Sequence, residues 1–150
     1  MAFAEGTTVP VKKTRGEIEA LVRKYGATRF TSGWDGAQAG LAFVVRGRQV
    51  KFIVPMPDQQ DKKLRAKAAA MRGWLATNLP KVIAAEERRR WRCLLLAIKA
   101  KLEIVHSGIA TFEEEFLAHI VTDNGQTVFE RISGDTATSA RMLPAIGSSS

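Results

Sequence analysis

The side chains that could do chemistry in this 150-residue chain are few and lie far apart. The two histidines, His106 and His119, fall on different predicted helices, so a metal site would need both to converge with a carboxylate such as Glu115. Adjacent glutamates on a helix point in different directions and cannot flank a substrate as a general acid and base would. We therefore expect no catalytic residues, no metal and no cofactor, and we interpret both histidines as solvent-facing.

Positive charge is the strongest compositional signal. The net charge is +8, and residues 61–107 hold twelve basic and four acidic side chains, whereas residues 108–150 hold two and six. Such a field attracts nucleic-acid phosphates, and it would also suit an anionic membrane or an acidic protein. Cys93 is the one cysteine, which we interpret as a small buried residue of a protein from a reducing compartment. No apolar run could cross a bilayer and no signal peptide is evident, so we expect a cytoplasmic protein without a membrane partner.

Basic and aromatic residues together predict a surface for single-stranded nucleic acid, on which rings stack on bases and cations follow the backbone. The candidate binding residues are Arg29, Trp34, Arg46, Arg48, Lys51, Trp74, Arg88, Arg89 and Arg92. The alternative interpretation is structural. Aromatic residues such as Phe43, Phe52 and Trp91 would fill the core, and the arginines would form a solvated helix flank whose stems cover apolar surface.

The first half of the chain predicts a helix followed by a small sheet. Residues 14–17 form a capping-box pattern, and a helix with an apolar face should run from there to Gly26. Period-two alternation over residues 28–34 predicts a strand, which ends at the turn residues Asp35 and Gly36. A hairpin follows. With Gly47-Arg48 as a type II′ loop, Val45 pairs with Val50, Phe43 with Phe52 and Leu41 with Val54, and all six share one face.

The second half predicts helices. An alanine-rich helix over residues 64–79 should break at Asn78 and Pro80, with Pro80 in the first turn of a long central helix that ends at Gly108. A core line on the long helix comprises Trp91, Leu95, Ile98, Leu102 and Val105. A second apolar line comprises Cys93, Leu96, Ala100 and Ile104. Either other elements of the chain cover both lines, which we favour, or the second line meets another subunit.

The C-terminal third begins with a second capping box. Thr111 and Glu114 predict the start of a further helix, and three consecutive glutamates suit its N-terminal end. Residues 127–132 could be a strand or a short helix. The sequence thus predicts one α+β domain over residues 1–132 and a flexible tail over residues 133–150. In this domain a three-stranded antiparallel sheet packs against an N-terminal helix and a long central helix, with a further C-terminal helix.

Four segments resemble a family of uncharacterised proteins from tailed phages and prophages. These are residues 14–26, the strand pair around Gly47-Arg48, residues 90–103 and residues 111–121. The family has no established activity, so the resemblance assigns no site residues. It implies a phage setting in the host cytoplasm, where small basic proteins without catalytic motifs often bind or anneal single-stranded DNA in replication or recombination. We therefore expect a non-catalytic single-stranded DNA-binding protein that forms a homo-oligomer. The alternative is a protein that binds and inhibits or redirects a host protein.

Overall fold

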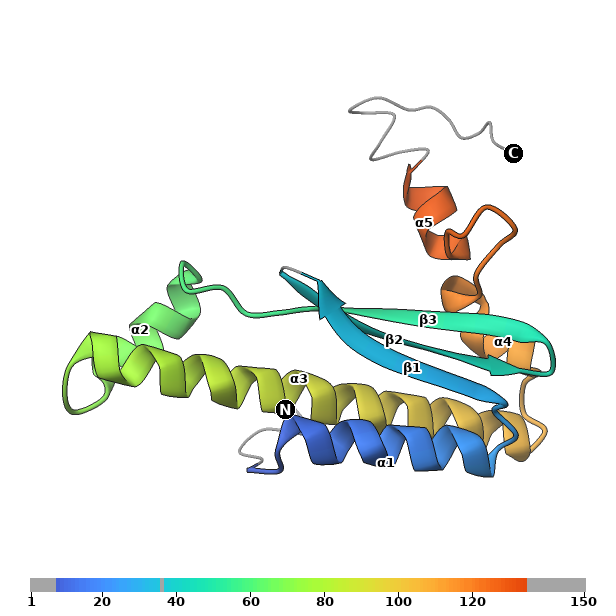
Figure 1. Ribbon diagram of the computed structural model, residues 1–150, viewed down its shortest axis with the longest axis horizontal. Helices are drawn as coiled ribbons and strands as arrows, with labels where there is room; N and C mark the ends of the chain where they lie inside the picture. The colour runs from blue at the N-terminus through green and yellow to red at the C-terminus, as the bar shows by residue number, and fades with distance from the viewer. Residues whose placement is uncertain (1–7, 36, 135–150) are drawn as a thin grey trace.

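The computed structural model describes residues 8–35 and 37–134, in which a three-stranded antiparallel sheet lies over a pair of helices (Figure 1). The elements in chain order are α1 (Val11–Lys24), β1 (Arg29–Asp35), β2 (Gln38–Val45), β3 (Arg48–Pro55), α2 (Lys62–Ala70), α3 (Leu75–His106), α4 (Phe112–Phe116), the 3-10 turn η1 (Leu117–His119) and α5 (Val128–Ser133). This confirms the predicted α+β fold with its N-terminal, long central and C-terminal helices. Residues 135–150, most of the predicted tail, lie outside the described residues.

The first helix starts earlier than the capping-box pattern predicts. Pro10 occupies the N-cap position of α1, and the Thr14 side chain is fully buried. Thr14 precedes Ile18 and Val22 at intervals of four residues, so it continues the apolar line that packs on α3. The Thr14 hydroxyl has no hydrogen-bond partner in the described part of the chain. The predicted end is confirmed, because Gly26 takes the left-handed conformation with φ of 105°.

The sheet has the strand order β1-β2-β3, and its hairpin register differs from the predicted one by two residues. Val45 pairs with Arg48, Phe43 with Val50 and Leu41 with Phe52, so the loop is Arg46-Gly47. Both loop residues have positive φ, 54° and 77°, as a type I′ turn requires. A shift of two residues keeps each side chain on its face, and all six predicted inward residues are buried.

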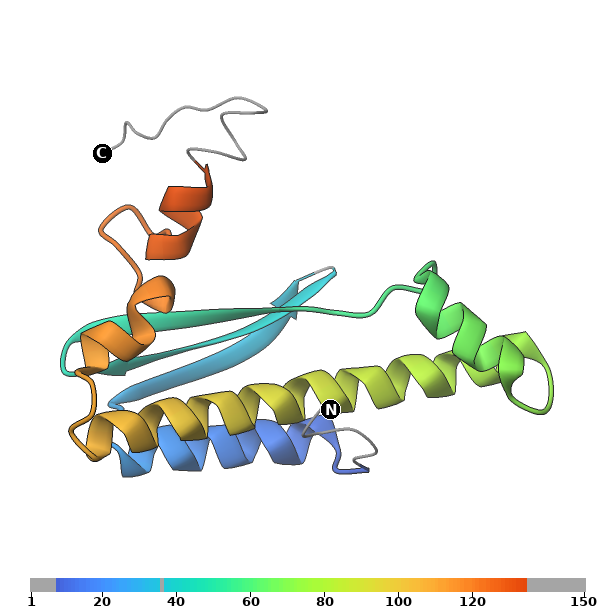
Figure 2. The ribbon, with the colours of Figure 1, turned by 180° about the vertical axis from the view of Figure 1, so that it is seen from behind.

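The main core lies between the sheet and the two helices α1 and α3, which run side by side (Figures 1 and 2). The predicted core line of α3 is confirmed: Trp91, Leu95, Ile98 and Leu102 are buried, and Val105 packs against them. Helix α4 adds Phe112 and Phe116, whose ring centroids are 4.6 Å apart. Phe116 also meets Phe43 and Phe52 edge-on at 6.2 and 6.3 Å. This aromatic cluster joins the C-terminal segment to the sheet.

The break between α2 and α3 lies at Gly73, five residues before the predicted one. Gly73 has φ of 105°, and Asn78 and Pro80 both lie within α3. The Asn78 amide donates hydrogen bonds to the carbonyl oxygens of Ala68 at 3.2 Å and Arg72 at 3.3 Å. The buried Asn78 side chain therefore binds free backbone carbonyl groups at the C-terminal end of α2. It does not end α3, the helix to which it belongs.

The second apolar line of α3 is partly covered within the described residues. Cys93, Leu96 and Ile104 are half-buried and Ala100 is exposed, so this line is covered less than the core line of α3. That other elements of the chain cover it fully stays a prediction. Its use by a second subunit stays a prediction.

The C-terminal predictions have mixed outcomes. The Thr111–Glu114 capping box at the start of α4 is confirmed. Residues 128–133 form the helix α5, which begins with another capping box between Thr127 and Glu130. Helix α5 lies on the opposite side of the sheet from α1 and α3 (Figures 1 and 2). This resolves the strand-or-helix alternative for the segment in favour of a helix.

Candidate nucleic-acid interface

Three of the four predicted cations of the sheet lie near the β2–β3 turn, and two of the four have acidic partners. Arg29 begins β1 and Arg46 lies in the turn, and both are exposed. The Nε of Arg48 lies 2.8 Å from a Glu113 carboxylate oxygen, and the Nζ of Lys51 lies 3.6 Å from Glu130. The carboxylate-rich C-terminal segment thus neutralises part of the positive charge of the predicted nucleic-acid-binding residues.

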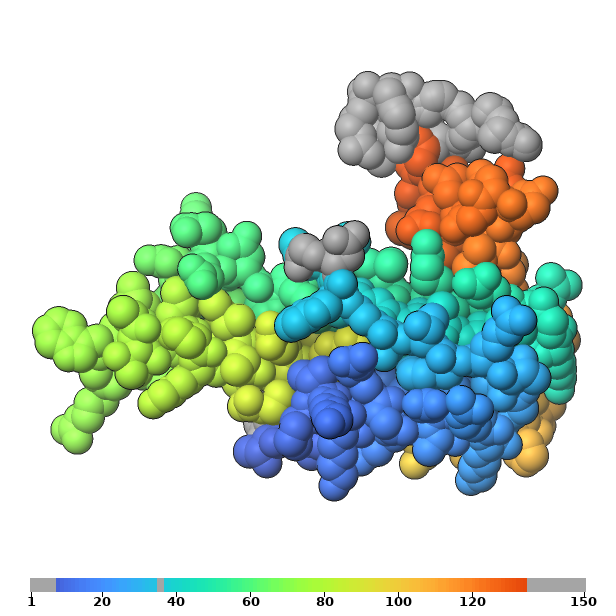
Figure 3. Space-filling view, viewed as in Figure 1, coloured from blue at the N-terminus to red at the C-terminus, as the bar shows by residue number. Residues whose placement is uncertain are grey.

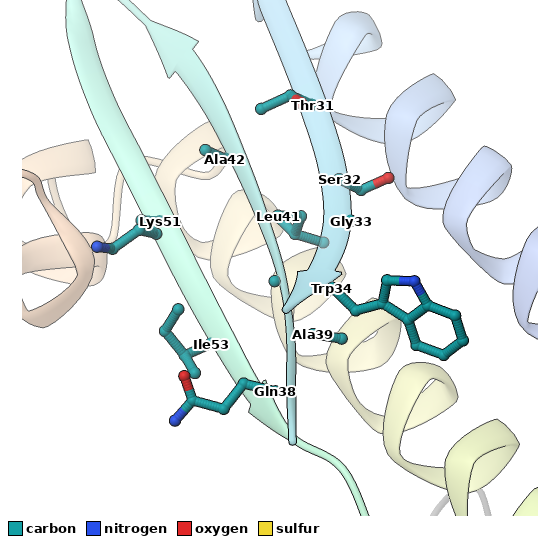
Figure 4. Close-up of a pocket in the computed structure, with 11 residues that line it drawn as sticks. Thr31, Ser32, Gly33, Trp34, Gln38, Ala39, Leu41, Ala42, Lys51 and Ile53 are labelled. Carbon is teal, nitrogen blue, oxygen red and sulfur yellow. The ribbon is translucent and has the colours of Figure 1, made fainter. Parts of the chain in front are cut away.

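Of the four predicted cations of the sheet, Lys51 lines the same shallow hollow as Trp34, and Arg29, Arg46 and Arg48 do not. Figure 4 shows Trp34 and Ala39 pointing to the helix side, whereas Lys51 and Ile53 point to the opposite side. Trp34 is 76% exposed. The structure therefore does not combine Trp34 with Arg29, Arg46, Arg48 and Lys51 into one groove.

The arginines in the middle of α3 take part in ion pairs. Arg89 and Arg90 both bind Glu86, with nitrogen–oxygen distances of 2.7 and 2.8 Å, and Arg92 binds Glu17 on α1. Arg88 is half-buried on the same stretch. Replacing Arg89 and Arg92 by glutamate would remove an ion pair within α3 and one between α3 and α1, as well as positive charge. Such a variant would therefore not be a clean test of phosphate contacts.

The ion pairs of Glu86 make the stability of the fold depend on pH. Hydrogen bonds from Arg89, and then from Arg90, lower the pKa of Glu86 from 4.5 to about 2, against the opposing effect of burial. The ionised carboxylate therefore stabilises the fold fully above pH 4.5, and this contribution is lost as the pH falls through about 2. We expect Glu86→Gln to lower the free energy of unfolding by about 1–3 kcal/mol at pH 7 and by much less near pH 2.5.

Urea unfolding of the wild type and of Glu86→Gln, at pH 7 and near pH 2.5, measures this difference. Glu87→Gln is the matched control because Glu87 forms no ion pair within residues 8–35 and 37–134, and it should change the stability by less than about 0.5 kcal/mol. An equal loss at both pH values would contradict the role of the Glu86 ion pairs.

The strongest concentration of unpaired positive charge lies elsewhere, in residues 59–85, which we call the α2–α3 lobe. It holds six basic residues and one acidic residue, whereas the other described residues hold sixteen basic and twelve acidic. The six are Lys62, Lys63, Arg65, Lys67, Arg72 and Lys81, and none forms an ion pair in the described part of the chain. Five of them are exposed. The acidic residue, Asp61, is occupied as the N-cap of α2.

The lobe projects beyond the sheet at one end of the molecule, as the green and yellow-green surface in Figure 3 shows. Its two helices pack on each other through a small separate cluster around Ala68, Leu79 and Val82. Between the lysines, the outward side of α2 carries exposed alanines, which allow a polyanion to approach the helix closely. Trp74 lies at the connection between α2 and α3 and is 81% exposed. The lobe thus combines cations and an accessible ring.

Of the predicted binding residues, Trp74 is the one that lies in the lobe, and sequence reasoning missed the lobe's six cations. The signal that could have found them is local charge density, because residues 59–85 contain six of the chain's 23 basic residues and one of its 15 acidic ones. The sequence pattern predicts an alanine-rich helix over residues 64–79 of this segment and assigns no function to its cations. A helix with small outward residues and unpaired lysines is also a surface for phosphates.

The remaining candidates for chemistry stay apart. His106 is exposed, as predicted, and its ring lies edge-on to Tyr25 at 5.8 Å. His119 is half-buried and stacks on Phe52 at 4.0 Å, so the prediction that it faces solvent is wrong. Burial lowers its pKa, with the nearby Lys101 adding to the effect.

Cys93 is half-buried rather than fully buried. Within residues 8–35 and 37–134, no group of three histidine, cysteine or acidic residues could hold a metal ion.

No known protein family, curated protein or solved structure matches the chain. In the described residues, no helix has the length and apolar character needed to span a bilayer.

Proposed function

We propose that this protein binds single-stranded DNA without catalysing a reaction, and that the α2–α3 lobe is its interface. The observation that carries the proposal is the set of six cations without ion pairs beside the exposed Trp74. Cations that are not engaged by carboxylates are free to replace the counterions of a phosphate backbone. A tryptophan at a helix connection can stack on an unpaired base, which a duplex does not offer. With the resemblance to tailed-phage proteins, DNA in replication or recombination is the substrate that we propose.

The test is the affinity of a labelled 20-nucleotide oligo-dT at several salt concentrations. With about four phosphate contacts, binding should weaken about 50-fold between 50 and 200 mM salt. Trp74→Ala should lower the affinity about 10-fold, because one base loses its stacking partner. The matched control is Phe129→Ala, since Phe129 is an exposed ring on α5, far from the lobe along the chain. The interface is wrong if Trp74→Ala and Phe129→Ala bind alike, or if a duplex binds as tightly as the single strand.

A second candidate function is the binding of a host protein. Leu117, Phe129 and Ile132 are exposed at the end of the molecule formed by η1 and α5. Exposed apolar side chains on neighbouring elements are typical of protein–protein contact surfaces. This candidate replaces the first if no oligonucleotide binds at low salt.

A further inference from the structure

A small cleft opens between the start of α1, the end of β1 and the middle of α3. Its volume is about 230 Å³, and the side chains that line it include Val11, Lys12, Arg15, Trp34, Met56 and Glu87. This volume is below the usual range for a complete drug-sized ligand, so the cleft suits one flat ring system. It lies on the helix side of the sheet, where Trp34 points (Figure 4).

The walls of the cleft suit an aromatic ligand. The indole of Trp34 is largely exposed and can cover one face of a ring, while Val11 and Met56 supply apolar contacts. The opposite end is rigid. The Arg15 guanidinium lies over the buried Trp91 ring at 5.9 Å and donates two hydrogen bonds to the Ser32 hydroxyl, at 2.7 and 3.0 Å. A ring entering the cleft would therefore meet a fixed wall and one accessible stacking surface.

Glu87 gives the cleft a hydrogen-bonding preference. The neighbouring Glu86 is held by two arginines, yet the half-buried Glu87 carboxylate forms no ion pair or hydrogen bond within the described ranges. An ionised carboxylate offers two acceptor oxygens and no donor. Among the bases, guanine presents two adjacent N–H donors on one edge, whereas cytosine and adenine present one amino group beside an acceptor. A carboxylate in this position therefore selects guanine.

The cleft is connected to the α2–α3 lobe through α3. The lobe ends at residue 85, and Glu87 lies two residues further along the same helix. Lys12 is an exposed cation that lines the cleft, and a phosphate next to a bound base would be attracted to it. We propose that the cleft binds a guanine base of the strand that the lobe holds. This inference rests on the proposed function, because the lobe supplies the sequence-independent part of the affinity and the cleft adds base selectivity.

The experiment compares 20-nucleotide oligo-dT strands that carry one central guanine, hypoxanthine or adenine. Hypoxanthine keeps the N1–H of guanine and lacks its amino group, so the expected order is guanine, hypoxanthine, adenine, with guanine bound about 10-fold more tightly than adenine. Glu87→Gln should reduce this ratio to about one. Trp34→Ala should reduce it as well. Glu19→Gln removes the same charge from the exposed side of α1 and should leave the ratio at about 10.

The outcomes separate this inference from the proposed function. If oligo-dT binds and depends on the lobe, but guanine gives no preference, the cleft is not a base site while the function stands. If no oligonucleotide binds, a titration with guanosine monophosphate still tests the cleft. In that titration the Trp34 indole resonance, assigned with Trp34→Phe, should shift in the wild type and stay unchanged in Glu87→Gln. An unchanged resonance in the wild type would overturn the proposal.

Discussion

Replacing Lys62, Lys67 and Arg72 together by glutamate is expected to weaken oligo-dT binding at least about 100-fold at 100 mM salt. These three side chains are exposed cations of the lobe without an ion-pair partner among the described residues. Their reversal removes phosphate contacts and adds repulsion at the same surface. The slope of log affinity against log salt should fall by about two, which is the contribution of three contacts to a single strand. Fluorescence anisotropy of a labelled strand measures both quantities.

The control for this variant is the reversal of Lys13, Lys24 and Lys99, which lie outside the lobe and are also exposed. It changes the net charge by the same amount, so it measures the non-local effect of charge, which should stay below about 10-fold. Circular dichroism should show unchanged helix content in both proteins, because none of the six side chains is buried. Equal losses in the two variants would mean that the total charge matters and that the lobe is not the interface.

Phe116→Ala is expected to lower the free energy of unfolding by about 3–5 kcal/mol. The Phe116 side chain is fully buried and contacts the rings of Phe43, Phe52 and Phe112. Its removal leaves a cavity where the C-terminal segment meets the sheet. These neighbours belong to different elements, so the site cannot collapse easily. Urea unfolding, followed by far-ultraviolet circular dichroism, gives the difference.

The neighbouring residue supplies the matched control for Phe116. Leu117 is the next residue in the chain but is about half exposed, so Leu117→Ala should change the stability by less than about 0.5 kcal/mol. A cost below about 1 kcal/mol for Phe116→Ala would show that α4 does not close the core as described.

The faces of the strands and the core line of α3 could be predicted because they depend on periodicity alone. The hairpin register could not be fixed in the same way. Gly47 fits the first position of a II′ turn, but it also fits the second position of a I′ turn when the preceding residue accepts positive φ, as Arg46 does. The start of α1 was misplaced for a related reason. Thr14 has the sequence of a cap, yet its spacing from Ile18 puts it on the buried side of a helix already under way.

The candidate interface was harder to predict than the fold, because charged surface residues do not recur at the regular spacing that core residues show. The sequence shows many cations, but it does not show which of them meet a carboxylate from a distant segment. Arg48 lies 65 residues from Glu113 in the chain, and Arg92 lies 75 residues from Glu17. Such pairs remove a cation from the candidate interface only after folding. The lobe kept its charge because its single acidic residue caps a helix.

Among the described residues, the small cluster that holds α2 against α3 contains three buried residues, whereas the main core contains seventeen. Opening α2 therefore exposes little apolar surface, and the sheet and the rest of α3 can remain folded while this happens. If α2 opens in the free protein, a DNA strand that binds only the closed form lowers the population of the open form. Part of its binding free energy is then used to keep α2 closed. Under the proposed function, DNA bound across the lobe would therefore also stabilise the packing of α2 against α3.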